Sequence, residues 1–206
     1  MTELPLEVAE YFPYDSVRPH QDQFIRTIFD AVEERRSILI EGSNGLGKTI
    51  SAISACLPTA IEKDLKILYV ARTHRQHDRV IEELRAVFKK HHVSGISIRG
   101  RNQMCLNNFA AKNAYDAKSL MEACEMLKAK GRCPYHKAPE EQTYEYLQLQ
   151  QQLATRPYTA SEIQKVCRRR RVRVENSYYD LLPAALKQWL ALSHLLRRND
   201  NVLPVL

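Results

Sequence analysis

The stretch of residues 42–49 constrains this chain more than any other. It reads Gly-Ser-Asn-Gly-Leu-Gly-Lys-Thr and fits the phosphate-binding pattern G-x-x-x-x-G-K-[ST]. The apolar run 37–41 before it predicts a buried strand, and the small and apolar residues 50–60 after it predict a helix that stops near Pro58. A strand, a glycine-rich loop and a helix N-terminus together direct backbone N–H groups and the positive end of the helix dipole at an anion.

Every position of this loop has an expected part in binding a nucleoside triphosphate. Lys48 would reach the β- and γ-phosphates and the Thr49 hydroxyl would bind Mg²⁺, which makes these two the predicted catalytic residues. The predicted nucleotide-contacting residues of the loop are Gly42, Ser43, Asn44, Gly45, Leu46, Gly47, Lys48 and Thr49. The alternative is a glycine-rich turn without a ligand, and the flanking strand and helix disfavour it.

The rhythm of apolar segments around the loop predicts the fold class. Apolar residues at helical spacing predict a helix from about residue 19 to 36 and another over 76–89, while the runs 65–71 and 96–98 predict strands. With the strand before the loop, this alternation predicts an α/β fold: a doubly wound parallel sheet with helices on both faces. Residues 1–17 are expected to form an irregular lead-in.

Two sites outside the loop have candidate binding residues. Gln21 opens the first predicted helix, and its amide is either a paired contact for an adenine edge or an ordinary surface glutamine. Arg72 and Thr73 follow a predicted strand, at the edge of the sheet where loops bind ligands in this fold class. A cation and a hydroxyl there could hold a nucleic-acid backbone.

Length and composition restrict the class of protein. With 206 residues, 44% of them apolar, the chain is long enough for one sizeable domain or one domain with an insertion. No apolar run approaches the about 18–20 residues that span a bilayer, and the N-terminus lacks the basic start and apolar core of a signal peptide. We therefore expect an intracellular protein with no membrane segment, whose five cysteines are ligands or buried thiols rather than disulfides.

The positive charge is concentrated toward the C-terminus. The net charge is +7, and residues 161–206 carry nine Lys or Arg against four Asp or Glu. A local basic surplus of this kind indicates a polyanionic partner such as nucleic acid. For the run Arg168–Arg171 alone, a solvated basic tail is an equally good interpretation.

Residues 99–167 differ from the rest of the chain. They contain no convincing strand, and polar helical stretches are predicted at 116–130 and 139–154. A polar insertion with little apolar surface gains order from a metal centre, and four thiolates suit zinc or an iron–sulfur cluster. The candidate ligands are Cys105, Cys124, Cys133 and Cys167. Their spacing, with no C-x-x-C pair, leaves four unrelated buried thiols equally open, and Cys56 is predicted to be a core thiol.

Several stretches together resemble the start of the XPD family of DNA helicases. These are residues 11–14 and 18–21 (Tyr-Phe-Pro-Tyr and Arg-Pro-His-Gln), the phosphate loop, and residues 69–74 (Tyr-Val-Ala-Arg-Thr-His). Residues 99–106 resemble the entry into the family's iron–sulfur domain, and residues 133–135 (Cys-Pro-Tyr) resemble its third ligand segment. The resemblance extends over residues 11–167.

The resemblance implies a superfamily-2 helicase that moves 5′ to 3′ on single-stranded DNA and uses ATP. Gln21 would read adenine, Lys48 and Thr49 would hold phosphate and Mg²⁺, and Arg72 and Thr73 would contact the DNA backbone. It also implies a [4Fe–4S] cluster held by Cys105, Cys124, Cys133 and Cys167. Expected partners are single-stranded DNA and repair or transcription complexes, in the cytoplasm of a bacterium or archaeon or in a eukaryotic nucleus.

The resemblance implies a P-loop, RecA-like parallel sheet interrupted by a mainly helical, cysteine-ligated insertion, and three domains follow from it. Residues 1–98 would be the N-terminal part of helicase motor domain 1, residues 99–167 the iron–sulfur domain, and residues 168–206 a divergent basic tail or the return to the motor domain. The sequence departs from the family after Cys167, where four arginines replace the usual Pro-Tyr-Glu, and residues 176–182 fit the next family segment only loosely.

The chain also contains no Asp-Glu-x-His box, the motif that would order Mg²⁺ and the attacking water. We therefore expect a fragment or truncated product that does not hydrolyse ATP by itself. The alternative functions are a small P-loop nucleotide phosphotransferase and a zinc-bound nucleic-acid module without catalysis.

Overall fold

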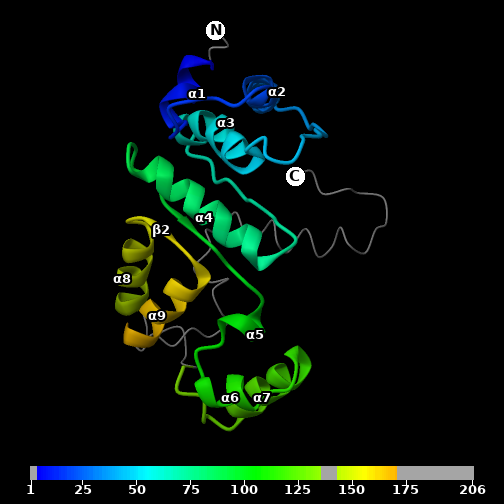
Figure 1. Cartoon of the computed structure of the whole chain (residues 1–206). Coiled ribbons are helices and arrows are strands. Elements are labelled where there is room, and N and C mark those ends of the chain that lie inside the picture. Colours follow the sequence, from blue (N-terminus) through cyan, green and yellow to red (C-terminus); the bar gives the residue numbers. More distant parts are fainter. Residues whose placement is uncertain (1–3, 136–142, 171–206) are drawn as a thin grey trace. The chain divides into compact units, whose positions relative to one another are not determined.

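The computed structural model describes residues 4–135 and 143–170. The chain divides into two compact units, one containing residues up to Gly95 and the other beginning at Ile96 (Figure 1). Each unit is described by itself. The predicted tail beyond residue 170, the segment 176–182 and the start of the helix predicted at 139–154 lie outside the described residues.

The first unit is built around the helix that follows the glycine-rich loop. Its helices are α1 (Leu6–Tyr11), α2 (Gln21–Glu33), α3 (Lys48–Glu62) and α4 (His74–Phe88). Helix α3 contacts each of the other three. The buried residues of this unit's core are Val8, Phe12, Phe24, Ile25, Ile28, Leu46, Ile50, Ile53, Ala55, Leu57, Val87 and Val93. The helices predicted before and after the loop are confirmed, as is the one that follows residues 65–71.

Two helix predictions for this unit were wrong in detail. The lead-in is not wholly irregular, because α1 forms within it and buries Val8 against the core. Helix α3 does not stop at Pro58 but continues to Glu62. A proline inside a helix removes one backbone hydrogen bond. Burial of Leu57 and Thr59, together with the hydrogen bond from the Thr59 hydroxyl to Glu33, offsets that loss.

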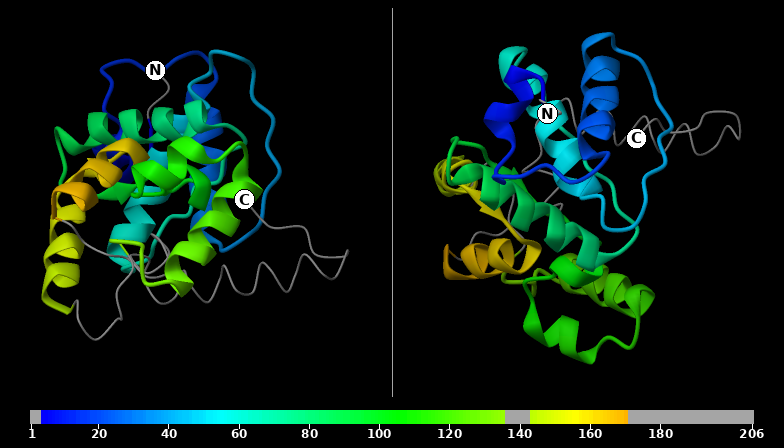
Figure 2. Two further views of the ribbon diagram at one scale, coloured as in Figure 1. Left: turned by 90° about the horizontal axis from the view of Figure 1, so that it is seen from below. Right: turned by 45° about the horizontal axis from the view of Figure 1, so that its top comes forward.

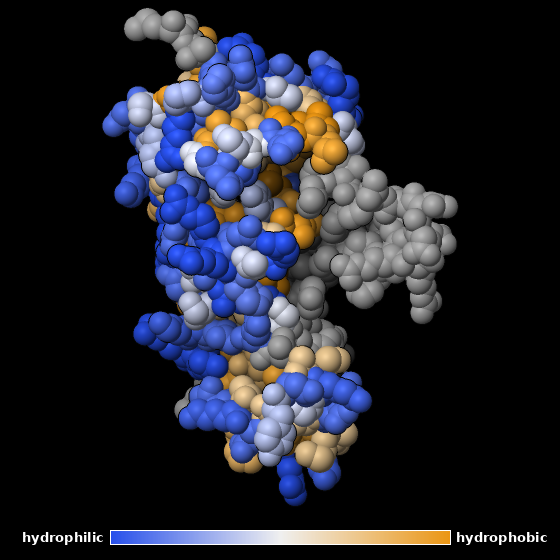
Figure 3. All heavy atoms as spheres, turned by 45° about the vertical axis from the view of Figure 1, so that its right-hand side comes forward, coloured by the Kyte–Doolittle hydropathy of each residue, from blue (hydrophilic) through white to orange (hydrophobic). Residues whose placement is uncertain are grey.

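The strands predicted at 37–41 and 65–71 do not form in the described residues. Both segments run as extended coil, drawn as thin ribbon without arrows (Figures 1 and 2). Leu39 is fully exposed and Val70 is 54% exposed. Figure 3 shows apolar residues, coloured orange, at the surface of the upper part of this view. A strand needs a neighbour to accept and donate its backbone hydrogen bonds, and the described residues place none beside these segments.

Among the residues that the structure describes, the predicted parallel sheet is represented by one small sheet. Strand β1 (Gly95–Ile96) pairs with β2 (Pro157–Tyr158), and the Ser97 N–H donates to the Tyr158 carbonyl at 2.9 Å. The strand predicted at 96–98 thus forms in part, but its partner lies in residues 99–167, where no strand was predicted. The result is a helix-rich fold with a small sheet, compatible with a helicase-like α/β fold.

The second unit consists of short helices around its own core. They are α5 (Arg101–Met104), α6 (Asn108–Asn113), α7 (Ala117–Ala129), α8 (Thr143–Leu153) and α9 (Ala160–Arg170). The buried core residues are Met104, Leu106, Leu149, Leu153, Tyr158, Ala160, Ile163 and Cys167. Asp116 caps α7, because its carboxylate accepts from the Ser119 N–H at 2.7 Å and Ser119 reciprocates. The helix predicted at 116–130 is confirmed, as is the described part of the one predicted at 139–154.

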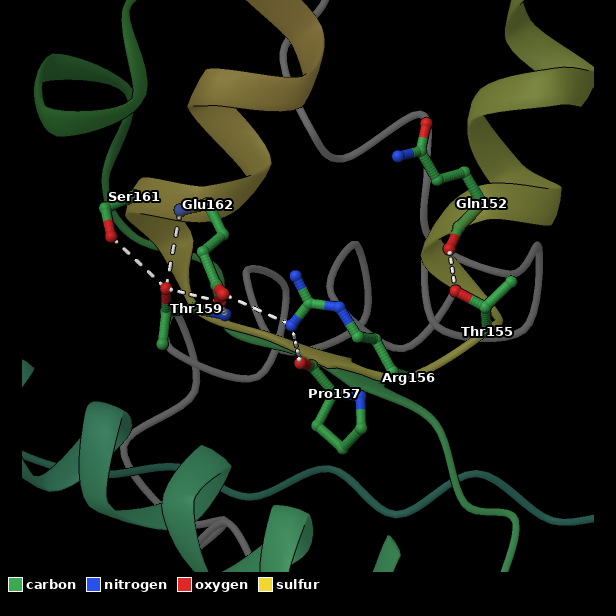
Figure 4. Close-up of polar contacts among 7 residues, drawn as sticks. All are labelled: Gln152, Thr155, Arg156, Pro157, Thr159, Ser161 and Glu162. Carbon is green, nitrogen blue, oxygen red and sulfur yellow. Dashed lines mark hydrogen bonds and ion pairs between the residues drawn. The ribbon is translucent and has the colours of Figure 1, made fainter.

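The start of α9 is fixed by a polar network (Figure 4). The Glu162 carboxylate accepts from the Thr159 N–H at 2.8 Å and from the Thr159 hydroxyl at 2.9 Å, which is a reciprocal helix cap. Arg156 donates to the same carboxylate at 3.2 Å, and its guanidinium lies 4.0 Å from the centre of the Tyr158 ring. The network joins β2 to α9 and so holds the helix that carries Cys167.

None of the helices in the described part of the chain is long and apolar enough to cross a membrane.

Candidate functional site

The glycine-rich loop turns sharply into α3. Gly45 and Gly47 have φ values of +87° and +85°, in the left-handed region that glycine tolerates best. Gly47 is the residue before the helix, and no side chain caps the helix there. The first N–H groups of an α-helix have no partner within the helix, so this end of α3 presents donors and a positive dipole.

Lys48 folds back over the loop that precedes it. Its ammonium group donates to the Gly42 carbonyl at 2.8 Å and to the Ser43 carbonyl at 2.9 Å, and the side chain is exposed. A Cβ on Gly42 would lie 2.8 Å from Leu46, 3.0 Å from Phe24 and 3.2 Å from Lys48. A larger residue at this position would have to displace the Leu46 side chain, so glycine keeps the loop and Lys48 in this arrangement.

The remaining predicted loop residues divide by exposure. Ser43, Asn44 and Gly45 are exposed, Thr49 is half-buried at the second position of α3, and Leu46 is buried in the core. Leu46 therefore anchors the loop, whereas the exposed residues border the space in front of the α3 N-terminus.

Gln21 lies beneath the loop and is 2% exposed, so it is not a surface glutamine. Its amide oxygen accepts from the Arg18 N–H at 3.0 Å, and its amide nitrogen donates to the Ser51 hydroxyl at 3.1 Å. Ser51 in turn donates to the Gly47 carbonyl at 3.0 Å. A Cβ on Gly47 would lie only 2.5 Å from the Gln21 amide nitrogen. Gln21 thus supports the loop from below, and its contact with adenine stays a prediction.

The structure adds Arg18 and Ser51 to the residues predicted for this site. The Arg18 guanidinium donates to the Gly45 carbonyl, in the middle of the loop. Arg18 stands three residues before Gln21, and Ser51 stands four residues after Gly47, one helical turn away. These spacings could have indicated that both residues lie near the loop. Spacing alone does not predict which side chain points toward the loop.

Arg72 and Thr73 lie at the start of α4. Thr73 is its N-terminal cap: its hydroxyl accepts from the Gln76 N–H at 3.3 Å, and the Gln76 side chain accepts from the Thr73 N–H at 3.2 Å. Arg72 and Arg75 are exposed on either side of the cap. A positive helix end with two exposed cations suits a phosphate backbone, but the Thr73 hydroxyl already has a structural role.

The cysteines do not all share one environment. Cys105, Cys124 and Cys133 are half-buried, whereas Cys167 is fully buried in the core of the second unit. Burial raises the pKa of the Cys105 thiol, and the nearby Cys124 and Cys133 thiols raise it further. Three of the predicted ligands are therefore close enough to interact electrostatically. The Arg168 guanidinium, next to Cys167, donates to the Cys105 carbonyl at 3.4 Å.

Within residues 4–135 and 143–170, no group of three or more His, Cys, Asp or Glu side chains is arranged to hold a metal ion. The four thiols match iron–sulfur chemistry in kind, but they do not converge on one point. Metal ligands commonly converge only when the metal binds, because binding and folding are coupled. The predicted ligand set stays a prediction. Cys56 packs against the core of the first unit and burial raises its pKa, as expected for a core thiol.

Comparison with known proteins places the chain in a family. It is 25% identical over 120 residues to the XPD helicase subunit of general transcription and DNA repair factor IIH from Arabidopsis thaliana. This match covers 52% of this chain and 16% of that protein. It is 26% identical over 106 residues to a probable ATP-dependent helicase of Methanocaldococcus jannaschii. This match covers 52% of this chain and 15% of that relative. The matches thus span about one-sixth of the relatives' length. No solved structure matches the chain.

A sequence model of the DEAD_2 family matches residues 69–179, more than half of the chain. The match covers Arg72, Thr73 and all four predicted cysteine ligands, and it begins after the glycine-rich loop. The chain therefore belongs to the DEAD_2 family, the N-terminal region of XPD/Rad3-type helicases.

Proposed function

We propose that this chain is the N-terminal part of an ATP-dependent DNA helicase of the XPD type, which moves 5′ to 3′ on single-stranded DNA. In this proposal residues 1–98 belong to the first motor domain, residues 99–167 form an iron–sulfur domain, and residues 168–206 are a basic tail or a return to the motor domain. Family membership supports this function over a small nucleotide phosphotransferase. The relatives' names support a role in DNA repair or transcription.

The observation that carries the proposal is the arrangement of Lys48 at the uncapped start of α3. Its ammonium group bonds two loop carbonyls, a position from which it can turn to the β- and γ-phosphates of ATP. The Thr49 hydroxyl would complete the site by binding Mg²⁺. Gln21, held under the loop, would read adenine.

Single-stranded DNA is the proposed second ligand. The exposed Arg72 and the N-terminus of α4 at Thr73 supply the positive charge and N–H donors that phosphates bind. Affinity built on such contacts falls as salt is added, because counterions are released from the DNA.

A [4Fe–4S] cluster is the proposed metal group. Cys105, Cys124, Cys133 and Cys167 would bind it together. Cys167 lies on α9, and the next residue on that helix, Arg168, donates to the Cys105 carbonyl. Bound iron and sulfide would stabilise the second unit in addition to its apolar core. One zinc ion in place of the cluster would favour the alternative nucleic-acid module.

Isothermal titration of the chain with Mg–ATP tests the nucleotide site. We expect Lys48→Ala to weaken binding about 10- to 100-fold, because a charged hydrogen-bonding group contributes about 1.5–3 kcal/mol. Lys66→Ala is the matched control, since Lys66 is exposed in the same unit and pairs with Asp64 at 3.0 Å. Equal affinity of the Lys48→Ala and parent chains would overturn the nucleotide site.

A further inference from the structure

A buried carboxylate, Glu83, ties helix α4 to the segment that leads into α2. The Tyr14 hydroxyl donates to Glu83 Oε2 at 2.5 Å, and Arg79 Nη2 lies 2.6 Å from Glu83 Oε1. The Glu83 side chain is only 5% exposed, and each of its carboxylate oxygens has one of these two partners. A buried carboxylate needs such partners because bulk water does not reach it. The hydrogen bond raises the pKa of Tyr14, and the Glu83 charge raises that of Arg79.

The Tyr14 bond joins residues that are 69 positions apart in the sequence. Tyr14 lies in residues 12–20, which form no helix or strand and connect α1 to α2. Such a connection depends on side-chain contacts for its path, because it has no repeating backbone hydrogen bonds. Phe12 fixes one end of it in the core, and Tyr14 fixes the next stretch to α4.

Four residues after Tyr14, the same connection contacts the glycine-rich loop through Arg18. The Arg18 guanidinium donates to the Gly45 carbonyl, and the Arg18 backbone exchanges hydrogen bonds with Gln21 at 3.0 Å in both directions. Gln21 then bonds Ser51, whose hydroxyl holds the Gly47 carbonyl. Tyr14 and Arg18 thus lie four residues apart in one connection, and two contacts with the loop lead through the turn from Arg18 to Gln21.

We propose that Tyr14 and Glu83 are positioning residues for nucleotide binding, which hold Arg18 against the glycine-rich loop. The inference rests on the proposed nucleotide site. Glu83 lies on α4, the helix that Thr73 caps, so the Tyr14–Glu83 bond links the element of the proposed DNA contact to the connection that bears Arg18. In this proposal neither residue contacts the nucleotide, and their effect passes through Arg18.

A double-mutant cycle tests this path. Mg–ATP affinity is measured by calorimetry for the parent chain, Tyr14→Phe, Arg18→Ala and the double variant. We expect Tyr14→Phe to weaken binding about three- to tenfold, the effect of one well-placed hydrogen bond. In the Arg18→Ala background the same substitution should cause no further change, because its effect acts through Arg18. Tyr11→Phe is the matched control; it removes the same atom from the side chain that packs on His91, and should leave the affinity unchanged.

The outcomes separate the two proposals. A parent chain with no Mg–ATP affinity overturns the nucleotide site. A parent that binds, with unchanged affinity in Tyr14→Phe, overturns only the positioning role. Equal weakening by Tyr14→Phe with and without Arg18 also overturns it, since that is the result of general destabilisation.

A second measurement needs no ligand. Hydrogen exchange of the free chain should become faster at the Arg18 and Gln21 amides in Tyr14→Phe, and should stay unchanged in Tyr11→Phe. Unchanged exchange at these two amides in Tyr14→Phe would contradict the proposed path.

Discussion

Gly45 and Gly47 share a left-handed backbone but differ in what surrounds them. A Cβ on Gly45 would meet nothing within 4 Å, whereas a Cβ on Gly47 would lie 2.5 Å from the Gln21 amide nitrogen. We expect Gly45→Ala to lower the free energy of unfolding by about 1–2 kcal/mol, the cost of a left-handed backbone for a residue with a Cβ. Gly47→Ala should cost about 1–3 kcal/mol more, because it also displaces Gln21.

Urea denaturation of the two variants measures this difference directly. Because the backbone cost is common to both glycines, subtracting one result from the other isolates the contact with Gln21. Equal destabilisation by the two substitutions would show that Gln21 does not support the loop.

At the scale of helices, α5, α7 and α9 carry or adjoin the four predicted metal ligands. We expect chain purified without oxygen to be brown, with about four irons and four sulfides per molecule. Cys105→Ser, Cys124→Ser and Cys133→Ser should each lose the colour and make residues 100–167 more accessible to protease, because metal binding and folding are coupled. Absorbance, iron and sulfide analysis and limited proteolysis measure these effects.

Two further variants make the metal experiment specific. Cys56→Ser is the control and should keep the colour, because Cys56 packs against the core of the first unit. Cys167→Ser tests the fourth position, where the sequence departs from the family: colour that survives it would remove Cys167 from the ligand set. Colourless protein with one zinc would contradict the cluster.

At the scale of the whole molecule, the proposed nucleotide site lacks the sequence motif that hydrolysis needs. The sequence contains no Asp-Glu-x-His box to order Mg²⁺ and the attacking water. We therefore expect ATP turnover at background, with or without single-stranded DNA, even where Mg–ATP binds. Release of phosphate measures this, with Lys48→Ala as the background control. Turnover well above that control and stimulated by DNA would show that other residues supply the missing carboxylates.

Much of the local structure followed from sequence patterns alone. Helices α2 and α4 were predictable because apolar residues recur along them every three to four positions, and that spacing favours a helix whatever lies beyond it. The loop before Lys48 was predictable for a similar reason: glycine at Gly45 and Gly47 permits a backbone that other residues disfavour. These features depend on neighbours in the sequence.

Contacts between distant residues were decided only by the tertiary structure. The runs 37–41 and 65–71 have the composition of buried strands, yet a strand forms only beside a partner, and in the described residues β1 pairs with β2 instead. Gln21 was compatible with an adenine contact or with the surface, and packing placed it under Gly47. The bond from Tyr14 to Glu83 had no signal in the sequence, because which side chains meet depends on how α4 packs against the rest of its unit.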